Sequence, residues 1–347
     1  MRNYIFIPKI SVKPDRVTLF NEVLWYGKGE NQTEKTIRTA PAVPVVKKFH
    51  GFKISNSAQK KIHEKVTWLY TLAKARYIKT YSGKEIKNFK ILFLTLTLPS
   101  IQKHPTATIT NELFNHFMTE MRQRTKIENY VWRLEFQGNG NVHFHIVTDC
   151  YIDYFFALKI WNRICNKLGY VDAYTEKMKR LSLNDYFLKY GKDQHEKFND
   201  LAKRYAKGVS QGWTQPPSVD VKICTSAASI SHYIAKYFSK KSPDNPLFNA
   251  LDNEDNSFSL RLWFCSRSLS KLTSIVEFEE TAIFRPDLLI KFAEGVKTYY
   301  AKYATCFFFQ LNKMSNYVKS LLYPYFTKYA ISMNYQPCLS NAYDPPE

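Results

Sequence analysis

The feature that most constrains the fold is a pair of strand-like segments around a short polar turn. Residues 130–136 and 142–147 are rich in β-branched and aromatic side chains, and 137–141 reads Gln-Gly-Asn-Gly-Asn. This pattern is typical of an antiparallel hairpin. Side chains alternate between the two faces of a strand, and directly paired residues share a face. The hairpin therefore fixes which of its side chains can meet.

Further periodic segments surround the hairpin. A helical spacing of apolar residues predicts helices, and alternation of apolar with polar residues predicts strands. Together they predict an α+β fold with a central antiparallel sheet flanked by helices. The expected helices cover 56–77, 110–124, 153–168 and 227–241, and the expected strands cover 91–98, 219–224 and one or two segments within 258–280.

The chain is expected to have three parts. Residues 1–54 contain several prolines and predict an irregular N-terminal segment, 55–280 form the main domain, and 281–347 form a helical, aromatic-rich C-terminal segment. Within the main domain, 175–212 is polar and Lys-rich, which suits helical pieces and loop. Its lysines and arginines either form a DNA-binding face or cover a solvated helical surface.

The charge of the chain favours a polyanionic partner. Lys and Arg number 50 against 30 Asp and Glu, which gives a formal net charge of +20, and 24 Tyr and 25 Phe are available to stack on unpaired bases. Nucleic acid is the first candidate and an anionic membrane the second; a merely basic protein is the alternative. The sequence has no apolar run of membrane-spanning length and no signal peptide, and its six cysteines are scattered, so we expect a cytoplasmic protein with reduced thiols.

Two histidines mark a candidate metal site on the hairpin. His143 and His145 are two residues apart on a predicted strand, so both imidazoles project from one face. A turn centred on Asn139 places Glu135 opposite His143 on that face. Two imidazoles and a carboxylate suit a divalent metal such as Mn²⁺, Mg²⁺ or Zn²⁺. A register slip of one residue would turn Glu135 away, and incidental histidines on a half-exposed sheet are the alternative.

A candidate nucleophile lies on the helix expected over 227–241. Tyr233 and Tyr237 are one turn apart, and each is followed three residues later by a lysine, Lys236 or Lys240. Tyr233 lies at the edge of the apolar stripe beside both lysines, which favours it as an exposed nucleophile. Tyr237 falls inside that stripe, where a packed core tyrosine is the competing interpretation.

These residue types suit phosphodiester cleavage by a phenol. The reaction needs an oxygen nucleophile in line with the scissile bond and positive charge on the phosphate oxygens. A metal would polarise the phosphate, and a lysine on the tyrosine's own helix would neutralise charge or lower the phenol's pKa. The products are a 5′-phosphotyrosine and a free 3′-OH, so the step is reversible as ligation.

Three segments in order resemble the motifs of HUH-endonuclease replication initiators. They are Phe93-Leu-Thr-Leu-Thr-Leu-Pro99, then Glu135 with His143-Phe-His145, then Tyr233-Ile-Ala-Lys236. The second tyrosine, Tyr237, is similar to the two-tyrosine initiators of Microviridae, and 139–145 and Trp161-Asn162 resemble those of Bacteroidetes-associated microviruses. The resemblance covers roughly 55–275.

The resemblance implies a function and its requirements. It implies a rolling-circle replication initiator with the histidine pair on a middle strand, dependence on Mg²⁺ or Mn²⁺, and binding of single-stranded DNA at an origin, with neither a membrane nor a small-molecule substrate as partner. The chain has no Walker A motif, so unwinding would come from a host helicase. A transposase or relaxase with the same chemistry, or a non-catalytic nucleic-acid-binding protein, remains open, as does a phage or plasmid source.

Overall fold

We analysed a computed structural model of the chain, which divides into two compact units. Residues 1–53 and 271–335 form unit 1, and residues 54–270 and 336–347 form unit 2. The structure describes residues 3–26, 54–80, 82–191, 198–224, 261–278, 296–309 and 314–339. The helix expected over 227–241 lies outside these described residues.

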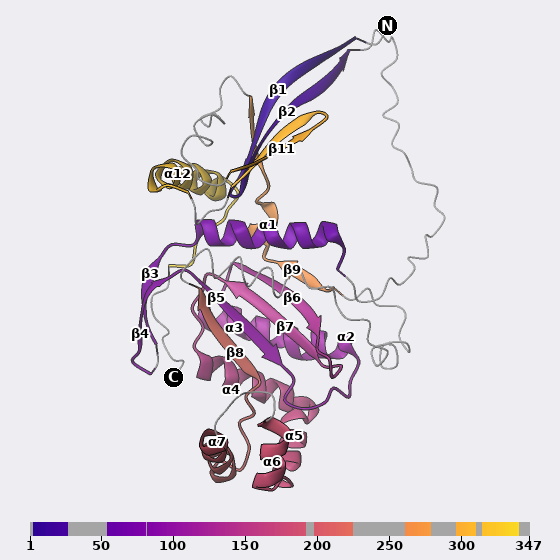
Figure 1. Ribbon diagram of the computed structural model, residues 1–347, viewed down its shortest axis with the longest axis vertical. Coiled ribbons are helices and arrows are strands. Elements are labelled where there is room, and N and C mark those ends of the chain that lie inside the picture. The colour runs from indigo at the N-terminus through magenta and orange to yellow at the C-terminus, as the bar shows by residue number, and fades with distance from the viewer. Residues whose placement is uncertain are drawn as a thin grey trace, which may run out of the picture. The chain divides into compact units, whose positions relative to one another are not determined.

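Unit 2 is built on a five-stranded antiparallel sheet. Figure 1 shows β7 in its middle, with β5 and β6 on either side. The order across the sheet is β8-β5-β7-β6-β9, so the predicted hairpin occupies two interior positions. The strands are β5 (Ile91–Thr97), β6 (Tyr130–Phe136), β7 (Val142–Thr148), β8 (Val219–Cys224) and β9 (Trp263–Cys265).

One face of this sheet carries the hydrophobic core. Val142, Phe144 and Ile146 of β7 are buried on this side, and Phe144 stacks on Phe114 with ring centroids 4.0 Å apart. Trp161 approaches the same ring edge-on, and its indole nitrogen donates to the carbonyl of Thr97 at 2.8 Å. Three helical segments and a fourth helix supply these partners: α2 (Thr106–Thr108), the π-helix η1 (Ile109–Phe114), α3 (Asn115–Thr125) and α4 (Tyr154–Cys165).

The hairpin turn is held by the loop that follows β5. The amide of Asn141 donates to the carbonyl of Ser100 at 2.8 Å, and its oxygen accepts from the backbone of Gln102 at 2.8 Å. Gly140 has a φ of 90°, a conformation that suits glycine. These bonds fix the start of β7 two residues before His143.

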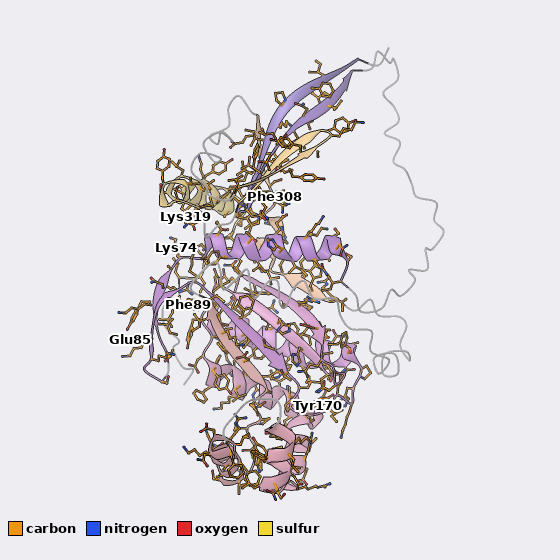
Figure 2. The ribbon with its side chains drawn as sticks, viewed as in Figure 1. Lys74, Glu85, Phe89, Tyr170, Phe308 and Lys319 are labelled. Carbon is orange, nitrogen blue, oxygen red and sulfur yellow. The ribbon has the colours of Figure 1, made fainter. Side chains whose placement is uncertain are left out.

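The remaining elements of the main domain surround the sheet. Glu85 and Phe89 mark the two ends of β4, which pairs with β3 in a small hairpin (Figure 2). The polar stretch after residue 169 forms helices, as its pattern predicts. The elements are α1 (Asn56–Leu72), β3 (Arg76–Lys79), β4 (Glu85–Phe89), the 3₁₀-helix η2 (Asn166–Leu168), α5 (Tyr170–Lys179), α6 (Leu183–Tyr190), α7 (Phe198–Ser210) and α10 (Arg267–Lys271).

Unit 1 corrects the expected irregular N-terminus. β1 and β2 pair along their whole length from Asn3↔Tyr26 to Lys13↔Arg16, despite Pro8 within β1. The prolines suggested irregular structure, but Ile10, Val12 and Val17 are fully buried because the strands join a second five-stranded sheet. Its elements are β1 (Asn3–Lys13), β2 (Arg16–Tyr26), β10 (Ile275–Phe278), β11 (Lys297–Ala301), β12 (Ala304–Phe308) and α12 (Asn316–Ser332).

The expected fold class is confirmed: antiparallel sheets are flanked by helices in an α+β arrangement. The C-terminal part is only partly helical, because β11 and β12 precede α12. Among the described residues, the helices are all too short or too polar to cross a bilayer.

Candidate metal centre on the central sheet

The histidine pair lies on the middle strand of the sheet, on the face opposite the hydrophobic core. His143 and His145 are on β7 with ring centroids 5.9 Å apart. Glu135 on β6 is the direct partner of His143, which is the register that a turn centred on Asn139 predicts. Strand alternation and register therefore bring these three residues onto one face.

His145 is held between the two neighbouring strands. Its Nδ1 is 3.1 Å from the hydroxyl oxygen of Thr95 on β5, and its Nε2 is 3.0 Å from Oε2 of Glu135 on β6. Its side chain is buried, and that of Glu135 is mostly buried. These two contacts fix the orientation of the ring and direct Nε2 toward the carboxylate.

His143 is a neutral imidazole that has one nitrogen without a hydrogen bond among the described residues. Burial, together with the nearby His145, lowers its pKa from 6.5 to about 4, while the charge of Glu135 opposes both effects. The nitrogen in question is Nε2, which is buried. A buried polar atom left unsatisfied costs stability, which is the usual mark of a position kept for another purpose.

Arg133 is a charged neighbour that the motif reasoning missed. It lies on β6 directly opposite His145 and is completely buried. Burial lowers the pKa of its guanidinium, and the carboxylate of Glu135 acts against that shift. The same alternation that selected Glu135 places Arg133 on this face, so the sequence held the signal for it.

The face continues across the sheet to β8. Thr95 pairs with Asp220, whose carboxylate lies 3.1 Å from the ammonium group of Lys222. Both side chains are about half exposed. This half-exposed edge of the face therefore carries both acidic and basic groups beside the buried histidine site.

The structure brings together only part of the predicted site. Glu135 and His145 are in contact and His143 is their neighbour, but in the described ranges three His, Cys, Asp or Glu side chains nowhere converge tightly enough to hold one ion. The predicted catalytic residues lie outside the described residues, so their roles stay predictions; they are Tyr233, Tyr237, Lys236 and Lys240.

The Trp161-Asn162 pair has a structural role in α4. While Trp161 binds the end of β5, the amide of Asn162 donates to the carbonyl of Pro216 at 3.0 Å and its oxygen accepts from the hydroxyl of Ser218. The two residues thus join α4 to the strand end and to the segment before β8. They support the sheet from its core side.

Comparison with known proteins places the site within a family match. Residues 91–242 match the family model of the replication-associated protein ORF2, a range that spans β5 to β8 and continues through the expected tyrosine helix. No curated protein and no solved structure matches the chain. The family match supports a rolling-circle replication initiator that binds DNA at an origin.

Proposed function

We propose that this protein initiates rolling-circle replication as a metal-dependent endonuclease. It nicks single-stranded DNA at an origin and stays joined to the 5′ end through a phosphotyrosine. The observation that carries the proposal is the 3.0 Å approach of His145 Nε2 to Glu135 Oε2. This contact lies beside the buried Nε2 of His143, within the range that matches the replication-associated family.

The contacts of His145 support a cation beside Glu135. A histidine that binds metal through Nε2 carries its proton on Nδ1, and Thr95 is placed to accept that proton. Nε2 then presents a lone pair to a carboxylate oxygen, and that approach needs a proton or a cation to be favourable. Two ligands bound at about 2.1 Å to one ion lie about 3.0–3.4 Å apart, so the observed separation fits a shared ion.

His143 would complete the ligand set by rotating its ring. Its low pKa keeps the imidazole neutral, which is the form that binds metals, and its Nε2 has no hydrogen bond to break among the described residues. A bound Mg²⁺ or Mn²⁺ would polarise the scissile phosphate. Arg133 stabilises the ionised form of Glu135 from the same strand face.

Tyr233 is the proposed nucleophile. Its phenolic oxygen attacks the phosphorus and forms the O–P bond while the bond to the 3′ oxygen breaks. The phenolic proton passes to a solvent base, and the departing 3′ oxygen takes a proton to become a hydroxyl. Lys236 and Lys240 neutralise phosphate charge, and Tyr237 attacks the regenerated origin in the second transfer.

The proposal is tested by covalent capture. We expect the protein, incubated with Mn²⁺ and a randomised single-stranded DNA library, to form an adduct that survives denaturation, and sequencing of the adducts to return one origin sequence. Tyr233→Phe should abolish the adduct, and Tyr237→Phe should reduce it less. His143→Ala and His145→Ala should abolish it, whereas His116→Ala on α3 serves as the matched control.

The alternatives give different results in this assay. A protein that binds nucleic acid without catalysis would hold the library with Mn²⁺ but form no adduct. A transposase or relaxase would form the same adduct, and the recovered sequence would then match an element end or a transfer origin. Multiple turnover on circular templates with an added helicase distinguishes the replication initiator from both.

A further inference from the structure

A cavity on the core side of the sheet has the composition of a nucleotide site. Its volume is about 340 Å³, near the lower end of the range for small-ligand pockets, which limits the occupant to about one nucleotide. It lies entirely within unit 2. Its lining residues are Ala107, Thr110, Asn111, Asn115, Met118, Arg122, Tyr130, Trp132, Arg261 and Phe264.

Aromatic side chains form one wall of this cavity. Tyr130 and Trp132 project from β6, and Phe264 projects from the edge strand β9 as the direct partner of Trp132. The rings of Tyr130 and Phe264 are tilted with centroids 6.5 Å apart. Because every nucleobase has a π-face, such a wall accepts an unpaired base with little regard to its identity.

One helical face forms the opposite wall. Asn111, Asn115, Met118 and Arg122 are spaced by three or four residues, so they lie along one side of η1 and α3. Asn111 belongs to the π-helix, a deviation that is common at functional sites. The two exposed asparagine amides offer donors and acceptors to the edge of a base.

Two arginines supply the positive charge of the cavity. Arg122 is exposed and close enough to Tyr130 for its charge to favour the phenolate, although burial raises the pKa of that phenol. The guanidinium of Arg261 lies 4.9 Å from the centre of the Phe264 ring. Arginine is suited to bind phosphate with two hydrogen bonds and to stack on a base.

We propose that this cavity binds one unpaired nucleotide of a DNA strand, with the base between the aromatic and helical walls and the phosphate at Arg122 and Arg261. This assignment rests on the proposed function for the identity of the strand. Tyr130 and Trp132 alternate with residues 133 and 135 on β6, so the cavity and the histidine face lie on opposite sides of the sheet. The cavity is therefore a second DNA contact, separate from the site of cleavage.

Equilibrium binding of a fluorescent single-stranded oligonucleotide, without metal, tests the assignment. We expect Arg122→Ala, Arg261→Ala and Phe264→Ala each to weaken binding about five- to tenfold, the range of one lost base or phosphate contact. The matched control is Arg180→Ala, which removes the same charge from the exposed C-terminal end of α5. Equal loss in Arg180→Ala and Arg122→Ala would overturn the proposal, since only net charge would then matter.

Crosslinking identifies the contact independently of folding effects. Oligonucleotides that contain 5-iododeoxyuridine should crosslink to the wild-type protein on peptides that include Tyr130, Trp132 or Phe264, and crosslinks confined to other peptides would overturn the proposal. Free deoxynucleoside monophosphate should compete only weakly. If it binds as tightly as the oligonucleotide, the cavity is a site for a free nucleotide and the strand assignment is wrong.

This experiment separates the two proposals. Binding without metal does not depend on nicking, so a wild-type protein that forms no covalent adduct can still show the expected loss in the cavity variants. Conversely, the cavity variants should form the adduct at saturating DNA, because they leave Glu135, His143 and His145 intact. Adduct formation with unchanged affinity in all three variants would remove the cavity inference and leave the endonuclease proposal in place.

Discussion

Single residues set the orientation of the candidate metal ligands, and Thr95 is the one that can be tested most cleanly. Its hydroxyl contacts Nδ1 of His145 at 3.1 Å, so Thr95→Val removes the contact while keeping the shape of the side chain. We expect Mn²⁺ affinity, measured by titration calorimetry, to fall about tenfold, as is usual for partners of ligating histidines. Thr97→Val, on the same strand and face, is the control. Equal effects of the two variants would contradict a positioning role for Thr95.

Asp149 makes a pH prediction at the same scale. Burial raises its pKa to about 6, against the hydrogen bonds from Cys338 and Asn129 and the charge of Arg76, which lower it. The folded state therefore binds the proton more tightly than the unfolded chain, whose pKa is about 4. The resulting stability is fully present below about pH 4 and is lost as pH rises through about 6, a change of about 3 kcal/mol.

The pH effect is measured against a variant that cannot ionise. Urea unfolding of wild type and Asp149→Asn between about pH 4.5 and 7.5, a window that brackets the shifted pKa, should show the wild type losing stability relative to the variant as pH rises. Tryptophan fluorescence is a suitable probe because five of the six tryptophans lie in unit 2. Asp200→Asn changes an exposed carboxylate and should show a constant difference from wild type. A constant difference for Asp149→Asn as well would refute the prediction.

At the scale of elements, the hairpin that carries the histidines depends on one glycine of its turn. Gly140 has a φ of 90°, so Gly140→Ala should destabilise unit 2 by about 1–2 kcal/mol. Gly138 is two residues away, lacks a positive φ and has open space where a Cβ would be built, so Gly138→Ala should be nearly neutral. Denaturation midpoints of the two variants should therefore differ clearly, and equal midpoints would show that the turn conformation is not specific.

The same hairpin shows how far sequence reasoning reached. Alternation and the polar turn were enough to predict β6, β7 and the Glu135↔His143 pairing, because both depend on local rules. The 3.0 Å contact of Glu135 with His145 rather than His143 depends on side-chain rotation, which no strand rule fixes. The π-helix η1 was expected as an ordinary helix from residue 110, because its apolar spacing differs little from that of an α-helix.

At the scale of the whole molecule, the sequence predicted the main sheet but missed unit 1. β1 pairs with β10, a strand close to the other end of the chain, from Lys9↔Phe278 to Val12↔Ile275. Hydrophobic patterns indicate elements, but they do not say which distant strands join. The prolines near the N-terminus then favoured loop, although Pro8 lies within a strand. Non-local pairing therefore explains why the two ends of the chain were expected as separate segments.

The C-terminal residues belong to unit 2, which leads to a prediction about chain ends. Gln336 accepts from Asn129 at 2.6 Å, and Cys338 donates to Asp149 at 2.9 Å and accepts from Arg76 at 2.8 Å. Deleting residues 336–347 should destabilise unit 2 by roughly 2–5 kcal/mol, because three hydrogen bonds are lost and buried polar groups lose partners.

A shorter deletion isolates the effect of these bonds. Removing only 340–347 leaves all three hydrogen bonds in place, so its urea midpoint should match that of the full chain. Adding Asp149→Asn to the longer deletion should then recover part of the lost stability, because a neutral amide is cheaper to bury without Cys338 than a carboxylate. Equal midpoints for the two deletions would mean that unit 2 is complete without its C-terminal residues.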